Sequence, residues 1–417
     1  MSRVAIIGVG QTALKPFSPE VSYKELMFEA AVKAYEDAGV DPRKDVQSFI
    51  GVSEDFWEGT SIFDEYLPDQ LGGALRPVCT IGNEGLAGIA TAAMQIMTGQ
   101  IGVAAVESHS KFSEVDRPLK VMQMAFDPIL NRPLDFNPHL VAGLEMARFL
   151  EVSGLPRNDC AKVVAKNRRN ALNNPYAAYP ARVAADTVLR SEETFSPLRE
   201  LEMSAAADGA TVVVLASEER ARKLTDDPVW IDGMGWANDT PTLESRDWAR
   251  ARYAEWSMRQ ASKMAGYSAK KADLYEIDDT YAYKEIQHAG ALGICRPADY
   301  AKFIRSGERP INPSGGSLGC GHTLDATGLF RLGEAVEQLR GLSGRRQVRG
   351  AKRALVQSWR GVPTTAGAVL LLSNNDAAPA GGGKPKDAPG FGPGSVRVAR
   401  RETPDTRPGR PGKEAIA

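Results

Sequence analysis

Cysteine is scarce in this sequence, and its few copies are scattered. The 417 residues include four cysteines, which lie far apart along the chain: Cys79, Cys160, Cys295 and Cys320. No two of them have the short spacing of a metal-binding motif, and the set does not make a disulfide framework. The sequence therefore predicts neither a disulfide-stabilised scaffold nor a protein-bound metal.

Net charge and long apolar runs are also missing. The formal net charge of −1 gives no general attraction to nucleic acid or to an anionic membrane. No segment approaches the length that spans a membrane. The first apolar run, Val4–Gly8, is too short for a signal peptide. We therefore expect a cytoplasmic protein without a membrane or nucleic-acid partner.

The residues that are present indicate a soluble globular protein with an α/β layered fold. The hydrophobic fraction is 43% and the charged fraction 25%, and the length predicts two or three domains. Val4–Val9 reads as a buried strand, and Ser22–Gly39 reads as a helix because Ser22 and Glu25 form a capping-box pattern. A second strand at Ser48–Val52 completes the strand–helix–strand order of α/β domains.

This strand–helix–strand unit occurs twice. The run Ala38–Lys44 and the run Ala265–Lys271 each combine a helix end, a glycine stop and a basic link that leads into a strand. In a second echo, the helices that end at Gly99 and Gly341 each lead into a strand. The sequence therefore predicts two similar α/β halves, joined near residues 230–240.

The stretch Asn312–Gly328 combines many glycines with a single histidine and runs into a helix-like segment, Leu329–Leu339. Glycine lets the main chain come close to a ligand, so His322 in this loop is a candidate to face a pocket. The run resembles the Asn-Pro-x-Gly-Gly … Gly-His-Pro-x-Gly-Ala-Thr-Gly signature of the thiolase family. Thr323 stands for the usual proline and Asp325 for a glycine.

The resemblance implies an architecture: the thiolase fold, with two βαβαβαββ halves in five layers and an inserted loop domain that helps to bind coenzyme A. We expect the first half at residues 1–235, the insertion at about 111–196 and the second half at 236–375. Lys166-Asn167 and Asn174–Ala177 resemble elements of that loop domain. The Pro- and Gly-rich tail, 376–417, is expected to be disordered.

The thiolase resemblance also implies a nucleophilic cysteine at the start of a buried helix, here Gly85–Met97. Counting back without a gap from the glycine that ends this helix puts Gly82 at the nucleophile position. Cys79 could serve only if the chain were shifted by almost a turn. A second cysteine is expected near Gly361, but no cysteine follows Cys320.

Two other blocks supply candidate groups for catalysis. The resemblance assigns His322 the task of polarising the thioester oxygen, with Gly321 and Gly361 as substrate-binding positions. The run from Tyr275 to Glu285 resembles the sterol-carrier type of thiolase, with Asp278 in place of a histidine and Tyr281 in place of a phenylalanine. We interpret Asp278 as a candidate base and Tyr281 as a further candidate, and a simple turn cap is the alternative for the adjacent acids.

Without an acyl-accepting cysteine, the scaffold can still stabilise a thioester enolate, because that needs only oriented donors. We therefore predict an acyl-CoA carbon–carbon lyase that cleaves a β-hydroxyacyl-CoA by a retro-aldol reaction. The sequence resembles a branch of thiolase-like steroid side-chain aldolases that lack the cysteine and pair with a small zinc-ribbon/OB-fold protein. The alternatives are a 3-oxoacyl-CoA thiolase (an acyltransferase) with a displaced nucleophile, and a non-catalytic scaffold or lipid-binding subunit. No tightly bound cofactor is expected, coenzyme A being part of the substrate, and the resemblance implies a homodimer.

Overall fold

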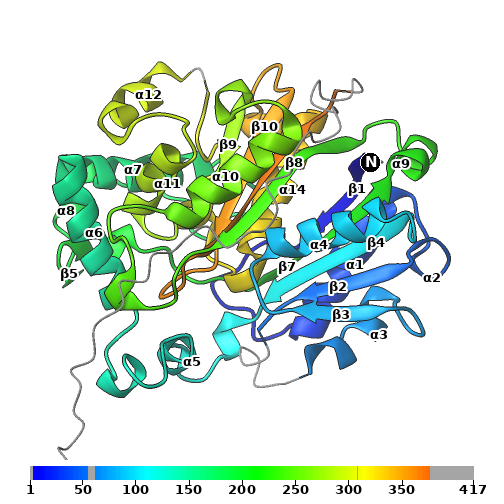
Figure 1. Ribbon diagram of the computed structural model, residues 1–417, viewed down its shortest axis with the longest axis horizontal. Coiled ribbons are helices and arrows are strands. Elements are labelled where there is room, and N and C mark those ends of the chain that lie inside the picture. Colours follow the sequence, from blue (N-terminus) through cyan, green and yellow to red (C-terminus); the bar gives the residue numbers. More distant parts are fainter. Residues whose placement is uncertain (1–2, 55–61, 308, 376–417) are drawn as a thin grey trace, which may run out of the picture. The chain divides into compact units, whose positions relative to one another are not determined.

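A computed structural model gives the structure of residues 3–54, 62–307 and 309–375 (Figure 1). The tail for which the sequence predicts disorder, 376–417, lies outside these residues. Within them, no helix combines the length and the apolar character needed to cross a membrane.

The first strand–helix–strand unit forms as the sequence predicts. Strand β1 (Val4–Gln11) leads to helix α1 (Tyr23–Ala38), and the fully buried strand β2 (Ser48–Val52) follows. The Ser22 side chain accepts a hydrogen bond from the Glu25 amide, while the Glu25 carboxylate accepts one from the Ser22 amide. The capping box is thus confirmed, and it fixes where α1 begins.

The rest of the first half adds three strands and the buried helix. Strand β3 (Val78–Ile81) precedes helix α4 (Gly85–Met97), which has the predicted bounds, and strands β4 (Val103–Ser110) and β7 (Gly209–Ser217) complete the half. Short helices lie between these elements: α2 (Pro42–Asp45), α3 (Pro68–Leu71) and α9 (Glu218–Leu224).

The second half repeats most of this order of elements, without a counterpart of β3. Its helices and strands are β8 (Val229–Asn238), α10 (Arg252–Ala265), β9 (Leu274–Glu276), α11 (Ala282–Ala291), α12 (Tyr300–Ser306), α13 (Gly316–Cys320), α14 (Thr327–Arg340), β10 (Arg353–Trp359) and β11 (Ala366–Ser373). The predicted boundary at 235/236 falls inside β8, which pairs with strands of both halves.

One nine-stranded sheet runs through both halves in the order β3-β2-β4-β7-β1-β8-β11-β10-β9. About the antiparallel pair of β1 and β8 the order is mirrored, except that the edge strand β3 has no counterpart in the second half. On each side the next strand, β7 or β11, is antiparallel to its neighbours, and the pairs β2–β4 and β9–β10 are parallel. The predicted internal repeat is therefore present in the strand order.

Helices cover both faces of this sheet, because alternate residues of each strand face opposite sides. On one side, Ala105 and Val212 pack with α1 in one apolar core. On the other side, Val106 and Val213 share a core with α4, with α14 and with the inner face of the second half. A third core joins the outer face of the second half, including Leu371, to α10 and α11. The strands of the two halves therefore count as two layers. The order of layers is helix, strands of the first half, paired central helices, strands of the second half and helix, so the α/β thiolase fold is confirmed.

Between β4 and β7 the chain leaves the repeat. This segment carries α5 (Pro118–Gln123), α6 (His139–Ser153), α7 (Arg157–Ala171), α8 (Ala185–Leu189) and a small hairpin of β5 (Glu193–Phe195) and β6 (Leu198–Arg199). The two long helices of this segment, α6 and α7, have 15 residues each. The segment packs on the second half, because α6 and α7 share the core of α10 and α11.

Candidate active site

The glycine-rich loop holds His322 against an extended segment that precedes β7. The His322 amide donates to the Ala205 carbonyl at 2.8 Å, and the Ala207 amide donates to the His322 carbonyl at 2.9 Å. Gly321 makes this approach possible: its φ is +113°, and an added Cβ would lie 2.6 Å from the Ala207 Cβ. The backbone of His322 is therefore fixed on both sides.

The imidazole of His322 is partly buried and presents a neutral N–H. The Leu324 amide donates to its Nδ1 at 3.3 Å, so we assign the ring proton to Nε2. Burial lowers the pKa of His322 to about 4, which keeps the ring uncharged near neutral pH. In this state His322 can donate a hydrogen bond, but it is not an acid.

His322 opens onto a cavity of about 230 Å³. One wall is apolar and comes largely from α5 and the chain before it, with Phe112, Leu119 and Met122 among its residues. The opposite wall is polar, and its side chains include Ser204, Thr280, Tyr281, His322, His139, Glu54 and Arg360. No cysteine is among the described residues that line the cavity.

Tyr281 and His139 form a pair in the polar wall. The Tyr281 hydroxyl lies 2.7 Å from Nδ1 of His139, although the residues are 142 positions apart in the sequence. Burial raises the pKa of Tyr281 and lowers the pKa of His139. Tyr281 is a candidate from the sequence, whereas His139, which begins α6, stands in no recognisable motif and gave no signal there.

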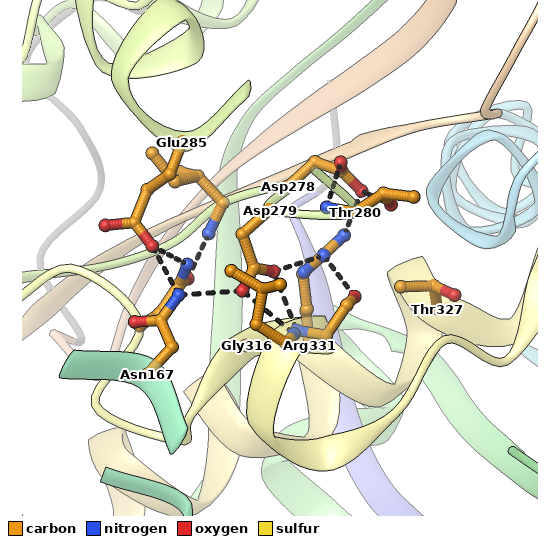
Figure 2. Close-up of polar contacts among 12 residues, drawn as sticks. Asn167, Asp278, Asp279, Thr280, Glu285, Gly316, Thr327 and Arg331 are labelled. Atoms are coloured by element: carbon orange, nitrogen blue, oxygen red, sulfur yellow. Dashed lines mark hydrogen bonds and ion pairs between the residues drawn. The ribbon is translucent and has the colours of Figure 1, made fainter. Parts of the chain in front are cut away.

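Asp278 lies behind the cavity wall, in a buried ion pair (Figure 2). Its carboxylate accepts from Arg331 Nη1 at 2.7 Å, from the Thr280 amide at 3.0 Å and from the Thr280 hydroxyl at 3.2 Å. Burial alone would raise the pKa of Asp278, but the Arg331 charge, neighbouring histidines and these hydrogen bonds lower it. Asp278 is absent from the lining, whereas Thr280, which it holds, is present.

Asp279 fastens the glycine-rich loop to the same arginine (Figure 2). Its carboxylate accepts from the amides of Ser317 and Leu318, at 2.7 and 3.1 Å, and from Arg331 Nη2 at 3.1 Å. Asn167 reaches it from α7, donating at 2.7 Å. Arg331 was not a candidate from the sequence, yet it joins both acids to the loop that carries His322.

The two sequence candidates for the family's nucleophile position, Gly82 and Cys79, both lie outside the described cavity lining. Gly82 is exposed, and an added Cβ there would meet nothing within 4 Å. Cys79 is half-buried in β3, where burial raises the pKa of its thiol and so disfavours the thiolate. Neither residue is among the described cavity residues. Gly361 lines the cavity. Gly321 is not among the described lining residues, and its part is to let the loop backbone approach Ala207 closely.

Glu84 occupies the start of the buried helix instead. Its side chain caps α4 by accepting from the Leu86 amide at 3.0 Å, and it accepts a hydrogen bond from Ser358 of β10. The carboxyl is 2% exposed, and its Oε1 has no hydrogen-bond partner among the described residues. Burial raises the pKa of Glu84 to about 7.

Among the residues that the structure describes, no group of three or more His, Cys, Asp or Glu side chains could hold a metal ion.

Comparison with known proteins places this geometry in a family. A family model described as Thiolase C-terminal domain-like matches residues 235–374. An acetyl-CoA acetyltransferase of Methanothermobacter thermautotrophicus is 30% identical over 389 residues, covering 89% of this chain and 100% of the relative. Sterol carrier protein 2 of Gallus gallus is 30% identical over 382 residues, covering 85% of this chain and 69% of the relative. A solved structure, the Ltp2-ChsH2(DUF35) aldolase, has the same fold with a TM-score of 0.76 at 22% identity, covering 89% of this chain and 97% of its own. The chain belongs to the thiolase superfamily.

Proposed function

We propose that this chain cleaves a β-hydroxyacyl-CoA by a retro-aldol reaction, without attaching an acyl group to a cysteine. One observation carries the proposal. The cavity contains the His322 imidazole N–H but no thiol among its described lining residues. The ungapped count along the sequence, which puts a glycine at the family's nucleophile position, supports the same conclusion. A site of this kind can stabilise an enolate, but it has no group to accept an acyl chain.

In this mechanism His322 supports the charge that develops on the thioester oxygen. Cleavage of the Cα–Cβ bond leaves its electron pair on the thioester fragment as an enolate. The Nε2–H of His322 donates to that oxygen, and the ring stays neutral because burial lowers its pKa to about 4. Ser204 Oγ, buried in the same wall and without a hydrogen-bond partner among the described residues, is a second donor. Such donors act strongly in a site that excludes water.

The sequence favours Asp278 as the base for the hydroxyl proton, and this role stays a prediction. Asp278 reaches the cavity only through Thr280, whose hydroxyl donates to it. A carboxylate that is paired with Arg331 and has a lowered pKa is a weak base. Its contacts fit a residue that holds Thr280 and Arg331 in place.

A thiolase that uses Cys79 is the second candidate function. A relative named acetyl-CoA acetyltransferase favours it, while the name of the aldolase with the same fold favours the retro-aldol reaction. That aldolase contains a second component, ChsH2(DUF35). We therefore include the small zinc-ribbon/OB-fold partner in the proposal and would assay the chain with and without it. Turnover in neither case would favour the non-catalytic scaffold or lipid-binding subunit.

Product analysis separates the reactions. A retro-aldol reaction converts a 3-hydroxyacyl-CoA into an aldehyde or ketone and one shorter acyl-CoA, and it consumes no free coenzyme A. A retro-Claisen reaction consumes one coenzyme A for each 3-oxoacyl-CoA and gives two thioesters. Intact-mass spectrometry adds a second test, since a covalent acyl adduct at Cys79 would identify the chain as a thiolase.

The His322 variants test the oxyanion role. His322→Ala should lower turnover about a hundredfold or more, the range for losing one oxyanion donor. His322→Gln keeps an N–H donor on a side chain of similar reach and should recover part of the loss. Equal turnover for the unaltered chain and His322→Ala would remove His322 from the mechanism.

A further inference from the structure

A phenol and an imidazole meet in the cavity wall that also holds His322. Tyr281 Oη lies 2.7 Å from Nδ1 of His139, and both residues line the cavity. Tyr281 is 1% exposed, and its ring packs against the rings of Tyr283 and Trp359, with centroids 6.1 Å away in both cases. Packing therefore fixes where the hydroxyl points.

The other acidic and basic groups of the cavity wall are already engaged. Glu54 is paired with Arg360, and the Asp325 carboxylate accepts from the Glu54 amide at 2.9 Å. Nδ1 of His322 accepts a backbone amide. Asp278 lies behind the wall. The Tyr281–His139 hydrogen bond, by contrast, joins two proton carriers in the lining itself.

We propose that Tyr281 and His139 form the proton-transfer pair of the retro-aldol reaction. Tyr281 receives the hydroxyl proton of the substrate, and His139 receives the Tyr281 proton. The inference rests on the proposed function and assigns within it the step for which the sequence favours Asp278.

The step balances without any further reactant. As the substrate O–H proton passes to the Tyr281 oxygen, the Tyr281 proton passes to Nδ1 of His139. The C–O bond becomes a carbonyl, and the Cα–Cβ electron pair becomes the enolate held by His322. The enolate carbon then takes a proton from Tyr281, which recovers its own from His139. One carbonyl product and one shorter acyl-CoA leave, and both side chains return to their starting state.

The surroundings of the pair suit this exchange. Burial raises the pKa of Tyr281, and the nearby charges of Asp278 and Glu145 raise it further, so the resting phenol keeps its proton. Burial lowers the pKa of His139, so its ring is neutral and Nδ1 can accept. A lasting tyrosinate is therefore unfavourable, which is why the transfer needs His139 as the next acceptor.

Two variants remove one member of the pair each. Tyr281→Phe keeps the ring packing and loses only the hydroxyl, and we expect kcat for 3-hydroxyacyl-CoA cleavage to fall about a hundredfold to ten-thousandfold. KM should change little. His139→Gln keeps a hydrogen-bond acceptor but cannot carry a proton, so we expect a similar loss of kcat. Imidazole added to His139→Ala should restore part of the rate, which a purely structural role for His139 would not allow.

Tyr283→Phe is the matched control. Its hydroxyl donates to Glu145 at 3.1 Å, Tyr283 is not among the described lining residues, and phenylalanine keeps the ring that packs on Tyr281, so kcat should stay within about threefold of the unaltered chain, a change of less than about 1 kcal/mol. Thermal melting of each variant establishes that it is folded. If the unaltered chain cleaves 3-hydroxyacyl-CoA while Tyr281→Phe and His139→Gln cleave it equally well, the pair is wrong and the proposed function stands. Loss of activity in Asp278→Asn alone would return the base to Asp278. Absence of cleavage by the unaltered chain, with its partner, overturns both proposals.

Discussion

At the scale of single residues, the interior of this protein uses carboxyl groups in two protonation states. Asp278 and Glu84 are both fully enclosed, at 0% and 2% exposure. Asp278 has the guanidinium of Arg331 at 2.7 Å and stays ionised, whereas Glu84 is held by an amide and a hydroxyl and has a pKa raised to about 7. The close cation, rather than the depth of burial, decides the charge.

Glu84 should therefore make stability depend on pH. Its pKa rises from 4.5 in the unfolded chain to about 7 in the fold, so the folded state binds the proton more tightly. The resulting stabilisation is fully present below about pH 4.5 and is lost as pH rises through about 7. Glu84→Gln cannot ionise, and its free energy of unfolding should fall less between pH 5 and 8, by on the order of 2 kcal/mol.

Urea denaturation at the two pH values measures this difference. Other buried acids, such as Glu276 with a pKa raised to about 8, also make the free energy of unfolding fall as pH rises. Only the difference in this pH dependence between the variant and the unaltered chain is therefore informative. Glu151→Gln, at an exposed position of α6, is the control and should leave the slope unchanged. Identical slopes for Glu84→Gln and the unaltered chain would show that Glu84 is ionised in the fold.

At the scale of elements, each half has a pair of glycines where its first strand packs against its first helix. Gly8 and Gly10 of β1 lie against α1, where an added Cβ would meet the carbonyl oxygens of Ala34 and Ala30 at 2.4 and 2.0 Å. Gly233 and Gly235 of β8 lie against α10 in the same way, with the Ala261 and Ser257 carbonyl oxygens both at 2.2 Å. The glycine pairs let each helix backbone approach its strand closely.

A methyl group at Gly235 should push α10 away from the sheet. The new Cβ would meet backbone atoms of α10, which cannot move aside as the end of a side chain can. We expect Gly235→Ala to lower the free energy of unfolding by about 1 to 3 kcal/mol, the usual cost of overpacking. Chemical denaturation measures the change.

Gly82→Ala provides the comparison, because an added Cβ there meets nothing within 4 Å. Its effect should stay within about 0.5 kcal/mol. If the two alanine variants were equally stable, the close approach of α10 to β8 would have no energetic weight.

At the scale of the whole molecule, the cavity is assembled from all three parts of the chain. The first half supplies Glu54, the insertion supplies His139 and the α5 wall, and the second half supplies Tyr281 and His322. The extended segment before β7 connects them, since Met203 bridges to Tyr281 and Ala206 bridges to His322. No half could form this site alone.

The assembly of chains stays a prediction at the same scale. We expect a homodimer, as the thiolase resemblance implies. Among the described residues β3 is the outermost strand on its side of the sheet and is only half-buried, and such an edge favours pairing with another strand. Sedimentation at micromolar concentration should therefore give twice the chain mass of 44.9 kDa. A single-chain mass at that concentration would contradict the prediction.

Local sequence patterns predicted the fold well, because each pattern lies within a single helix, strand or loop. The capping box of Ser22 placed α1, the apolar run placed α4 with its observed bounds, and the glycine-rich loop led into α14. The predicted helix Leu329–Leu339 starts two residues early in the structure, at Thr327. Such boundary shifts are expected, because the first and last turns of a helix depend on contacts outside it.

The candidate site was harder to predict, because its chemistry depends on contacts between distant residues. His322 stood in a dense motif and could be found, whereas the placement of Gly82 at the nucleophile position stays a prediction. His139 and Arg331 had no local signal, since an isolated histidine at a helix start and an arginine on a helix are ordinary residues. Only packing brings His139 to Tyr281 and Arg331 to Asp278.

The sequence alone determined the two-half α/β architecture and the loop that carries His322, and it predicts a glycine at the nucleophile position. Tertiary structure alone decided in which direction burial and ion pairs shift the pKa of each buried acid, which side chains face the cavity and which of them touch. The physical reason is that helices and strands follow from residue patterns within a few turns of chain. Ionisation and proton transfer follow instead from burial and from distances of about 3 Å between groups that the fold brings together.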